Sequence, residues 1–426
     1  MRDMLLGRKP KDVDIVTSAT PDEVEALFPR TVPVGKQFGV VLVLWQGKPY
    51  EVATFRSDSK EGDGRRPKEV TFTGAEEDAQ RRDFTINGMF YDPVTDKVLD
   101  YVGGKNDLHE KLVHFIGDPD ERIAEDHLRI LRAVRMVHQI GGQYHLATYQ
   151  ALKRNAAMVK DISAERVRDE LNKMLLLPSR AGAFEDLFEL GILDQILPEL
   201  SAMKGVAQPM RYHREGCVWN HAMRSLHTLP GKDHSLPFLW AVLLHDVGKP
   251  ETFAVAERVR FDGHAERGGE IAKRITARLK FPNAEADEIT WLVSHHMMTL
   301  FVLKMPKDKK VKWITHPYFK HLLALLRADA MGTVPAELSL YRRLRKLAQE
   351  TIKKLPPVLP KLITGTEIIE LTGLRPGKEV GKVIEKIERL QLKGKIRTRN
   401  QARKIVIASE VVAPLKKSVG RVMKAR

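Results

Sequence analysis

Two carboxylates, Asp12 and Asp14, stand one residue apart in the short run of residues 11–16, which also holds three aliphatic side chains. If this run forms a β-strand, side chains two positions apart point to the same face of the sheet. Carboxylates on one face repel each other unless a cation lies between them, and magnesium or manganese are the divalent ions that prefer such oxygen ligands. Solvated turns also contain Asp-x-Asp, so the pair needs support from the rest of the chain.

A second set of charged residues lies downstream. Residues 39–45 and 50–56 have the pattern of two β-strands and are joined by a turn at 47–49. This predicts a hairpin that carries Glu51. Arg81, Arg82 and Asp83 then stand side by side. Guanidinium groups suit phosphate oxygens, and a carboxylate can accept a hydrogen bond from a ribose hydroxyl.

The order of these motifs resembles the class II CCA-adding enzyme and bacterial poly(A) polymerase family, which are template-independent nucleotidyltransferases of the polymerase-β superfamily. The likeness runs from Met1 to about residue 200 and rests on Arg-Asp-x-Leu-Leu-Gly-Arg-x-x-x-Asp-x-Asp at 2–14, Glu-Val-x-Thr-Phe-Arg at 51–56 and Arg-Arg-Asp-Phe-Thr-Ile-Asn at 81–87. Nucleotidyl transfer uses two metal ions to bridge the attacking hydroxyl and the triphosphate. The resemblance implies that Asp12 and Asp14 hold Mg²⁺ and that Glu51 is a third catalytic acid, with a solvated hairpin residue as the alternative for Glu51.

The segment 125–129 matches the base-reading motif of that family and opens a predicted helix. By resemblance, Asp126 and Arg129 would face the edge of an incoming cytosine or adenine, because a spacing of three puts them on one helix face. The alternative is an ordinary surface ion pair. The resemblance assigns the following residues to the nucleotide: Arg2, Asp3, Arg81, Arg82, Asp83, Asp126, Arg129, Arg132 and Arg135.

One feature departs from the family pattern. Family members carry a Gly-Gly pair just before the position of Met1, and glycine lets the backbone approach a triphosphate closely. This sequence begins after that pair. The expectation is therefore a head truncated at its N-terminus, through a misplaced start or a truncation.

Histidines and aspartates recur between residues 211 and 335 in the order His, His-Asp, His, His-His, Asp. This pattern resembles the HD superfamily of metal-dependent phosphohydrolases. The resemblance implies a metal held by His221, His245, Asp246 and Asp329, and a second one held by His264 with one or both of His295 and His296. Mixed imidazole and carboxylate ligands suit Mn²⁺, Ni²⁺ or Co²⁺ better than calcium. Lys249 either meets a phosphate or is a solvated lysine.

Composition agrees with these assignments. The net charge of +16, from 71 basic and 55 acidic residues, favours a polyanionic partner such as the 3′ end of tRNA, with CTP and ATP as nucleotide substrates by resemblance. The single cysteine, Cys217, excludes an internal disulfide and suits a reducing cytoplasm. The sequence shows no run of transmembrane length and no signal sequence, so a cytoplasmic enzyme without a membrane or protein partner is expected.

The elements that must position these residues indicate an α+β chain. A small polymerase-β-type head with hairpins is expected over 1–117, and a helical neck that reads the base over 118–200, with helices at 119–140, 147–159, 163–177 and 181–191. The HD domain is expected over 211–335 and a basic helical tail over 336–426. Residues 58–74 read as a mobile loop beside the head site.

Three functions fit the sequence. The first is a tRNA nucleotidyltransferase that builds or repairs the 3′-terminal CCA, or adds its A, with an HD phosphohydrolase attached. The second is a poly(A) polymerase, but residues 34–40 lack the paired basic residues before Phe38 that are associated with bacterial poly(A) polymerases. The third is an RNA-binding HD phosphohydrolase with an inactive head.

Overall fold

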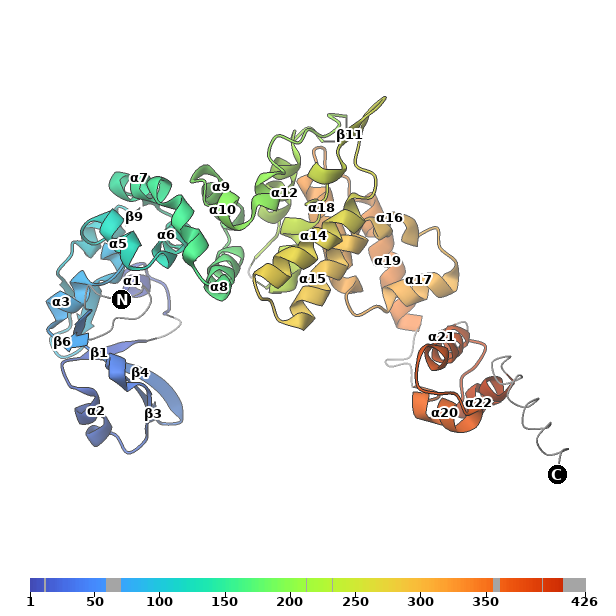
Figure 1. Ribbon diagram of the computed structural model, residues 1–426, viewed down its shortest axis with the longest axis horizontal. Coiled ribbons are helices and arrows are strands. Elements are labelled where there is room, and N and C mark those ends of the chain that lie inside the picture. The colour runs from blue at the N-terminus through green and yellow to red at the C-terminus, as the bar shows by residue number, and fades with distance from the viewer. Residues whose placement is uncertain are drawn as a thin grey trace. The chain divides into compact units, whose positions relative to one another are not determined.

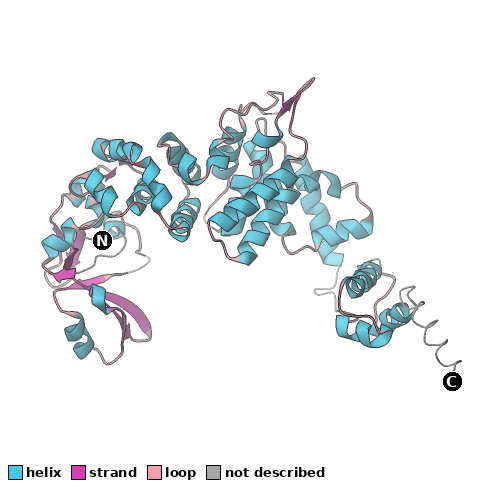
Figure 2. Cartoon of the chain, in the orientation of Figure 1, coloured by secondary structure: helices cyan, strands magenta, loops and turns pink. Residues whose placement is uncertain are grey.

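A computed structural model describes residues 1–10, 13–58, 70–211, 213–231, 233–354, 361–392 and 394–408, leaving aside the side chains at 58 and 392. Helices predominate and the sheets are small, which confirms the predicted α+β class (Figures 1 and 2). The chain divides into two compact units, residues 1–293 with 331–335 and residues 294–330 with 336–426.

The head is built on a four-stranded sheet in the order β1 (Ile15–Thr17), β4 (Lys48–Thr54), β3 (Val40–Trp45) and β2 (Thr31–Gly35). Strand β1 runs parallel to β4, and the other pairs are antiparallel. Helix α2 (Pro21–Leu27) covers one face, where Val24 packs with the buried Val41, Val43 and Val52. The helix begins with Thr20 in a capping box and proline at its first position.

The predicted hairpin is confirmed, but its turn lies earlier than expected. Gln46 and Gly47, both with positive φ, form the two-residue loop, and Lys48 already pairs with Trp45. Pro49 can enter β4 because β1 pairs only with Val52–Thr54, so Pro49 has a strand neighbour on one side alone.

Short elements complete the head and lead into the neck. Phe84 bridges to Phe115, which brings the chain after Arg81, Arg82 and Asp83 against the last segment of the head, just before the neck begins. The elements are α1 (Arg2–Leu5), η1 (Lys36–Phe38), β5 (Arg56–Asp58), β6 (Val70–Phe72), α3 (Ala75–Gln80), η2 (Thr85–Asn87), β7 (Met89–Asp92), β8 (Lys97–Asp100), α4 (Gly104–His109) and β9 (Leu112–Val113).

The neck is helical, as predicted, but the helix expected over 119–140 is broken. Helix α5 (Pro119–Glu125) ends before Asp126, whose backbone is extended, and α6 (Leu128–Ile140) begins two residues later. The Asp126 carboxylate accepts the Leu128 backbone N–H at 3.1 Å and so caps the second helix. The remaining elements are β10 (Gln143–Tyr144), α7 (Leu146–Arg154), η3 (Ala156–Asp161), α8 (Ala164–Leu175), α9 (Arg180–Glu189), α10 (Leu193–Ile196) and α11 (Pro198–Ser201).

The histidine-bearing part of the first unit packs around α13 (Leu236–Leu244), which is buried on all sides from Phe238 onward and leads directly into His245. The other elements here are α12 (Val218–His227), η4 (Pro250–Thr252), β11 (Ala254–Val255), β12 (Val259–Arg260), α14 (His264–Arg278) and most of α15 (Asn283–His295). Cys217 precedes α12 and its carbonyl accepts the backbone N–H of His221 at 3.1 Å.

The second unit contains two apolar cores. One forms around Val302, Leu326 and Leu344, and the other around Ile368, Val383 and Val406. Its elements are η5 (His296–Met298), α16 (Thr299–Val302), α17 (Lys307–Ile314), most of α18 (Phe319–Gly332), α19 (Ser339–Lys354), α20 (Gly365–Thr372), α21 (Lys378–Leu392) and α22 (Arg399–Ile407). In the part of the chain that the structure describes, no helix is long and apolar enough to cross a membrane.

Candidate nucleotide-binding cleft and metal centre

An open cleft of about 990 Å³ in the first unit is lined by charged residues of the head and neck. Eight of the nine residues that the resemblance assigned to the nucleotide line it: Arg2, Asp3, Arg81, Arg82, Asp83, Asp126, Arg129 and Arg132. The structure therefore brings together side chains from α1, the segment after α3, and the start of α6, which lie up to 130 residues apart in the sequence.

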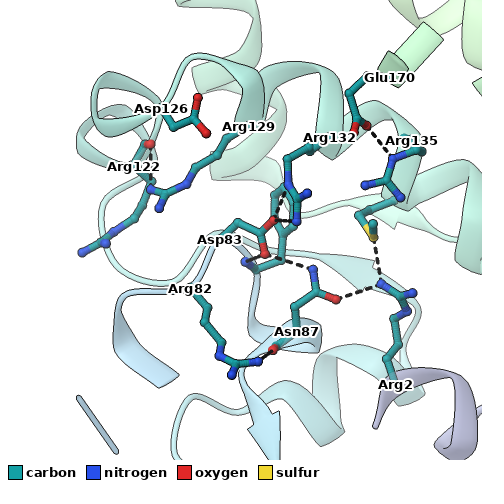
Figure 3. Close-up of polar contacts among 12 residues, drawn as sticks. Arg2, Arg82, Asp83, Asn87, Arg122, Asp126, Arg129, Arg132, Arg135 and Glu170 are labelled. Atoms are coloured by element: carbon teal, nitrogen blue, oxygen red, sulfur yellow. Dashed lines mark hydrogen bonds and ion pairs between the residues drawn. The ribbon is translucent and has the colours of Figure 1, made fainter. Parts of the chain in front are cut away.

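Asp83 anchors a polar network at the base of this cleft (Figure 3). Its carboxylate accepts the Phe84 backbone N–H at 2.8 Å, the Asn87 amide at 2.9 Å, and Nε of Arg132 at 2.7 Å. Burial alone would raise the pKa of Asp83, but the charge of Arg132 and the hydrogen bond from Asn87 hold that pKa below its ordinary value. Asp83 is therefore ionised and fixes the direction of Arg132.

Asn87 extends the network to the first helix. Its side-chain oxygen accepts Nη1 of Arg2 at 2.8 Å, and the same Arg2 nitrogen lies 2.9 Å from the Met136 sulfur on α6. Because Asn87 also donates to Asp83, one amide orients two groups of opposite charge on the cleft wall. The sequence analysis did not single out Asn87, although it is the last residue of the Arg-Arg-Asp-Phe-Thr-Ile-Asn motif.

Asp126 and Arg129 both line the cleft, but they do not share a helix and each has other partners. Asp126 precedes α6 and accepts Nη2 of Arg166 at 2.8 Å, whereas Arg129 donates to Glu125 at 2.5 Å and to the Arg122 carbonyl at 2.8 Å. The predicted placement on one helix face is corrected here, because the cap formed by Asp126 interrupts the helix. Arg166 also lines the cleft, and the sequence analysis missed it.

Arg135 does not line the cleft. It is buried and its Nε donates to Glu170 on α8 at 2.5 Å, while Nη1 donates to Gln139 at 2.7 Å. One helical turn separates it from Arg132. The Arg135 guanidinium thus joins two neck helices, and its contact with the nucleotide stays a prediction.

Of the carboxylates predicted to be catalytic, the structure describes two: Asp14, next to the edge strand β1 of the head sheet, and Glu51, on the inner strand β4. Asp14 is exposed, lines the cleft and directly precedes β1, while Asp12 lies outside the described residues. Ile15, which follows Asp14, pairs with Val52, which follows Glu51. Glu51 is exposed on β4 and is not among the described residues that line the cleft.

The centre of the histidine-bearing region is buried. Nδ1 of His221 faces Glu215 at 3.1 Å, Nδ1 of His245 faces the Val242 carbonyl at 2.8 Å, and Nδ1 of His264 faces the Phe261 carbonyl at 2.8 Å. Because these oxygens are acceptors, each Nδ1 carries the proton and each Nε2 presents a lone pair. Nε2 of His221 and Nε2 of His245 nevertheless lie 3.2 Å apart. Two lone pairs held face to face fit a shared cation.

Asp246 supplies the negative charge of this centre. Its Oδ2 lies 3.4 Å from Nε2 of His245 and 3.8 Å from Nε2 of His221, while Oδ1 lies 3.7 Å from Nε2 of His264. Burial would raise the pKa of Asp246, but Lys249 and His245 hold it well below its ordinary value. Lys249 is itself buried, 2.7 Å from the Asp246 carboxylate, so it is not a solvated lysine.

Glu215 was missed by the sequence analysis. Its carboxylate accepts Nδ1 of His213 at 2.7 Å, Nδ1 of His221 at 3.1 Å and the Val334 backbone N–H at 2.9 Å. Burial would raise the pKa of Glu215, but the hydrogen bonds from His221 and His213 lower it to about 2. A buried carboxylate that fixes the tautomer of a ligating histidine is the usual support of a metal site.

The remaining expected ligands belong to the second unit. His295 ends α15, the buried His296 begins η5, and the half-buried Asp329 lies on α18. Their assignment as ligands stays a prediction.

Comparison with known proteins defines the class. Family models match the chain in succession: a poly A polymerase head domain at residues 1–114, a "probable RNA and SrmB- binding site of polymerase A" at 145–204, and an HD domain at 218–311. Fold and site thus define a polymerase-type nucleotidyltransferase head joined through a helical neck to an HD domain.

The relatives are more specific. The CCA-adding enzyme of Bacillus velezensis is 32% identical over 413 residues, which are 96% of this chain and 92% of that enzyme. The chain therefore belongs to the CCA-adding enzyme family and is a nucleotidyltransferase, as predicted. The CCA-adding enzyme of Bacillus pumilus is 47% identical over 176 residues, an alignment that spans only 41% of this chain and 44% of that relative.

Solved structures agree. The Bacillus stearothermophilus CCA-adding enzyme in complex with CTP matches with a TM-score of 0.66 and 25% identity, over 99% of this chain and 92% of that chain. The Thermotoga maritima CCA-adding enzyme complexed with tRNA_CCA has a TM-score of 0.55 and 20% identity, over 96% of this chain and 88% of that chain, and it supports the fold alone.

Proposed function

We propose that this chain adds or repairs the CCA at the 3′ end of tRNA, or its terminal A, using CTP and ATP. The observation that carries the proposal is the cleft in which Arg2, Arg81, Arg82, Arg129 and Arg132 converge beside Asp14. Several guanidinium groups in one cleft with the exposed carboxylate of Asp14 suit a metal-bound nucleoside triphosphate. The names of the relatives and the CTP complex of one of them supply the substrate class.

Each side chain would have a separate role. Asp14, together with Asp12, would hold Mg²⁺, because carboxylate oxygen at an exposed strand edge is the donor type that ion prefers. Glu51 would contribute a third acid, which is supported by the pairing of the residues that follow Asp14 and Glu51, Ile15 and Val52. Arg81 and Arg82 would bind the triphosphate, Asp83 the ribose side, and Asp126 with Arg129 the base, with Arg2, Asp3 and Arg132 completing the wall of the cleft. Bound magnesium would polarise the triphosphate and the attacking hydroxyl.

We further propose a divalent transition metal, Mn²⁺, Ni²⁺ or Co²⁺, at His221, His245 and Asp246, with Asp329 as the fourth ligand. The opposed Nε2 lone pairs support it. The two oxygens of Asp246 face different histidines, which favours a second ion held by His264 with His295 or His296. Such a centre would supply an activated water for hydrolysis of a phosphate ester.

Two further assignments complete the proposal. The domain limits are 1–117 for the head, 118–200 for the neck, 211–335 for the HD domain and 336–426 for the tail. The site of action is the cytoplasm, and the single cysteine of the chain is compatible with that reducing compartment.

Separate incubation with radiolabelled CTP and ATP tests the function. The substrates are one tRNA transcript that lacks its 3′-terminal CCA and one that ends in CC. Addition of two C residues and one A supports full CCA synthesis, and addition of A to the second transcript alone supports the narrower activity. A long A tract would instead make the chain a poly(A) polymerase. No incorporation, combined with hydrolysis of 2′,3′-cyclic nucleotides in Mn²⁺, Ni²⁺ or Co²⁺, would leave the HD phosphohydrolase as its function.

A further inference from the structure

One buried carboxylate, Asp78 on α3, holds two neighbouring arginines of the cleft. Its Oδ1 accepts Nε of Arg81 at 2.9 Å and Nη2 of Arg81 at 2.7 Å. Its Oδ2 accepts Nε of Arg82 at 3.1 Å and Nη2 of Arg82 at 3.0 Å. Both oxygens are thus used in side-on, two-donor pairs, one to each guanidinium.

Burial separates the acid from the cleft. The Asp78 side chain is 1% exposed, whereas those of Arg81 and Arg82 are 24% and 27% exposed. Both arginines line the cleft and Asp78 does not. Asp78 is therefore behind the arginines, where it can orient them but cannot touch a nucleotide.

Further contacts fix the same geometry. Nε of Arg81 also donates to the Arg56 carbonyl at 2.9 Å, and the Arg56 backbone N–H donates to Asp78 at 3.3 Å. Nη1 of Arg82 donates to the Asn87 carbonyl at 3.0 Å, and its guanidinium carbon lies 4.4 Å from the centre of the Phe90 ring. Two adjacent guanidinium groups would repel each other, so a carboxylate between them lowers the cost of holding both in place.

We propose that Asp78 is the positioning residue for the nucleotide's phosphates, acting through Arg81 and Arg82. The inference rests on the proposed function, in which these arginines bind the triphosphate. The physical reason is preorganisation. Because Asp78 fixes both guanidinium groups before the nucleotide binds, less side-chain entropy is lost on binding.

The test compares Asp78→Asn with Glu76→Gln, which removes the same charge from an exposed position of the same helix. We expect kcat/KM for CTP to fall roughly 10- to 100-fold in Asp78→Asn, mainly through the nucleotide KM. The KM for tRNA and the values for Glu76→Gln stay within about twofold of wild type. Inhibition by tripolyphosphate, which has no base or ribose, weakens in parallel with CTP binding.

A double-mutant cycle with Arg81 and Arg82 separates a positioning role of Asp78 from a purely structural one. In an Arg81→Ala, Arg82→Ala background, adding Asp78→Asn has little further effect on kcat/KM, because the groups through which it acts are gone. A multiplicative loss in that background, or an unchanged nucleotide KM in Asp78→Asn, overturns the inference. If the two arginine substitutions themselves leave the KM for CTP unchanged, the proposed function of the cleft fails instead.

Asp78→Glu covers the case in which Asp78→Asn does not fold. It retains the charge but moves the carboxylate, so the nucleotide KM should lie between the values for wild type and Asp78→Asn. If Asp78→Asn cannot be purified, Asp78→Glu is compared with wild type and Glu76→Gln, and a raised KM for CTP is expected. A folded Asp78→Glu protein with thermal unfolding like wild type and an unchanged KM for CTP would count against the proposal.

Discussion

His221 is held by Glu215: the imidazole donates from Nδ1 to the buried carboxylate at 3.1 Å, and the opposite nitrogen, Nε2, faces His245. The same carboxylate accepts a second imidazole and a backbone N–H, so both of its oxygens are engaged. A glutamine at this position would have to turn its NH₂ toward at least one of these donors. Glu215 therefore sets the tautomer in which His221 can ligate a metal.

The first prediction follows from that contact. Glu215→Gln should weaken Mn²⁺ or Co²⁺ binding about 10- to 100-fold, since outer residues of a metal site typically contribute that much. Equilibrium dialysis of the metal and the visible absorption of Co²⁺ both measure this without any enzymatic reaction. Glu189→Gln, an exposed glutamate on α9, is the control. Unchanged affinity in Glu215→Gln would show that Glu215 does not support a metal at His221.

A second prediction concerns the carboxylates of the head. Asp14→Ala, and equally Asp12→Ala, should abolish incorporation of CTP and ATP while leaving tRNA affinity nearly unchanged, because the carboxylates would hold the ions and not the RNA. Gel-based incorporation and a filter-binding isotherm on the same preparations measure the two quantities. Asp194→Ala, an exposed residue of the neck, should behave as wild type. Near-normal incorporation in both variants would remove the assignment.

Base selection gives a third prediction. Asp126→Ala and Arg129→Ala should reduce the preference for CTP and ATP over UTP and GTP by one to two decades, since an unpaired buried polar group costs about 1–3 kcal/mol. Arg166→Ala should do the same more weakly, because it releases Asp126 from its 2.8 Å ion pair without removing the carboxylate. The measurement is kcat/KM for all four nucleotides on one tRNA that ends one residue short. Selectivity that is intact in all three variants would place base reading elsewhere.

The pair of Arg135 and Glu170 yields a stability prediction with a defined pH dependence. Burial would raise the pKa of Glu170, but Arg135 and Lys173 bring it below its ordinary value. A carboxyl whose pKa is lower in the folded than in the unfolded state stabilises the fold above the unfolded pKa of about 4.3, and this contribution is lost as the pH falls. Glu170→Gln should therefore cost about 3–5 kcal/mol at pH 7 by leaving Arg135 buried without its partner.

Unfolding in urea at several pH values checks this. The difference between wild type and Glu170→Gln should shrink as the pH falls from about 5 toward 3, because the wild-type carboxyl then becomes neutral as well. Asp169→Asn, which removes a charge from an exposed position of the same helix, is the matched control. If the difference in unfolding free energy between wild type and Glu170→Gln does not depend on pH, then packing and not the ion pair stabilises the contact between these helices.

Residues that the sequence placed correctly belong to local patterns. The hairpin expected from residues 39–45 and 50–56 is confirmed, because turn signals and strand alternation act over a few residues. The helix break at Asp126 was not predicted from the sequence, because an aspartate within an apolar helical periodicity is equally compatible with a surface residue and with a helix cap. The paired placement of Asp12 and Asp14 remains a prediction, since Asp12 is outside the described residues.

Supporting residues were harder to foresee. Asp78, Glu215 and Arg166 carry no spacing signal of their own, because each acquires its role from a partner that the fold brings close, such as Val334 for Glu215, 119 residues away. Conversely, Arg135 fits the helical spacing of Arg129 and Arg132, yet it faces Glu170. Periodicity gives the face of a helix but does not identify which side chains on that face meet the cleft and which meet a neighbouring helix.

Cys217 gives the chain a practical property. It is the only thiol in 426 residues, it is half-buried, and it lies one helical turn, about 5–6 Å of rise, before His221. A maleimide fluorophore or a nitroxide attached there would be a single-site reporter without any background mutation. A nitroxide this close to a paramagnetic Mn²⁺ would lose signal as the ion binds, so occupancy of the buried centre could be followed while the head is engaged with nucleotide.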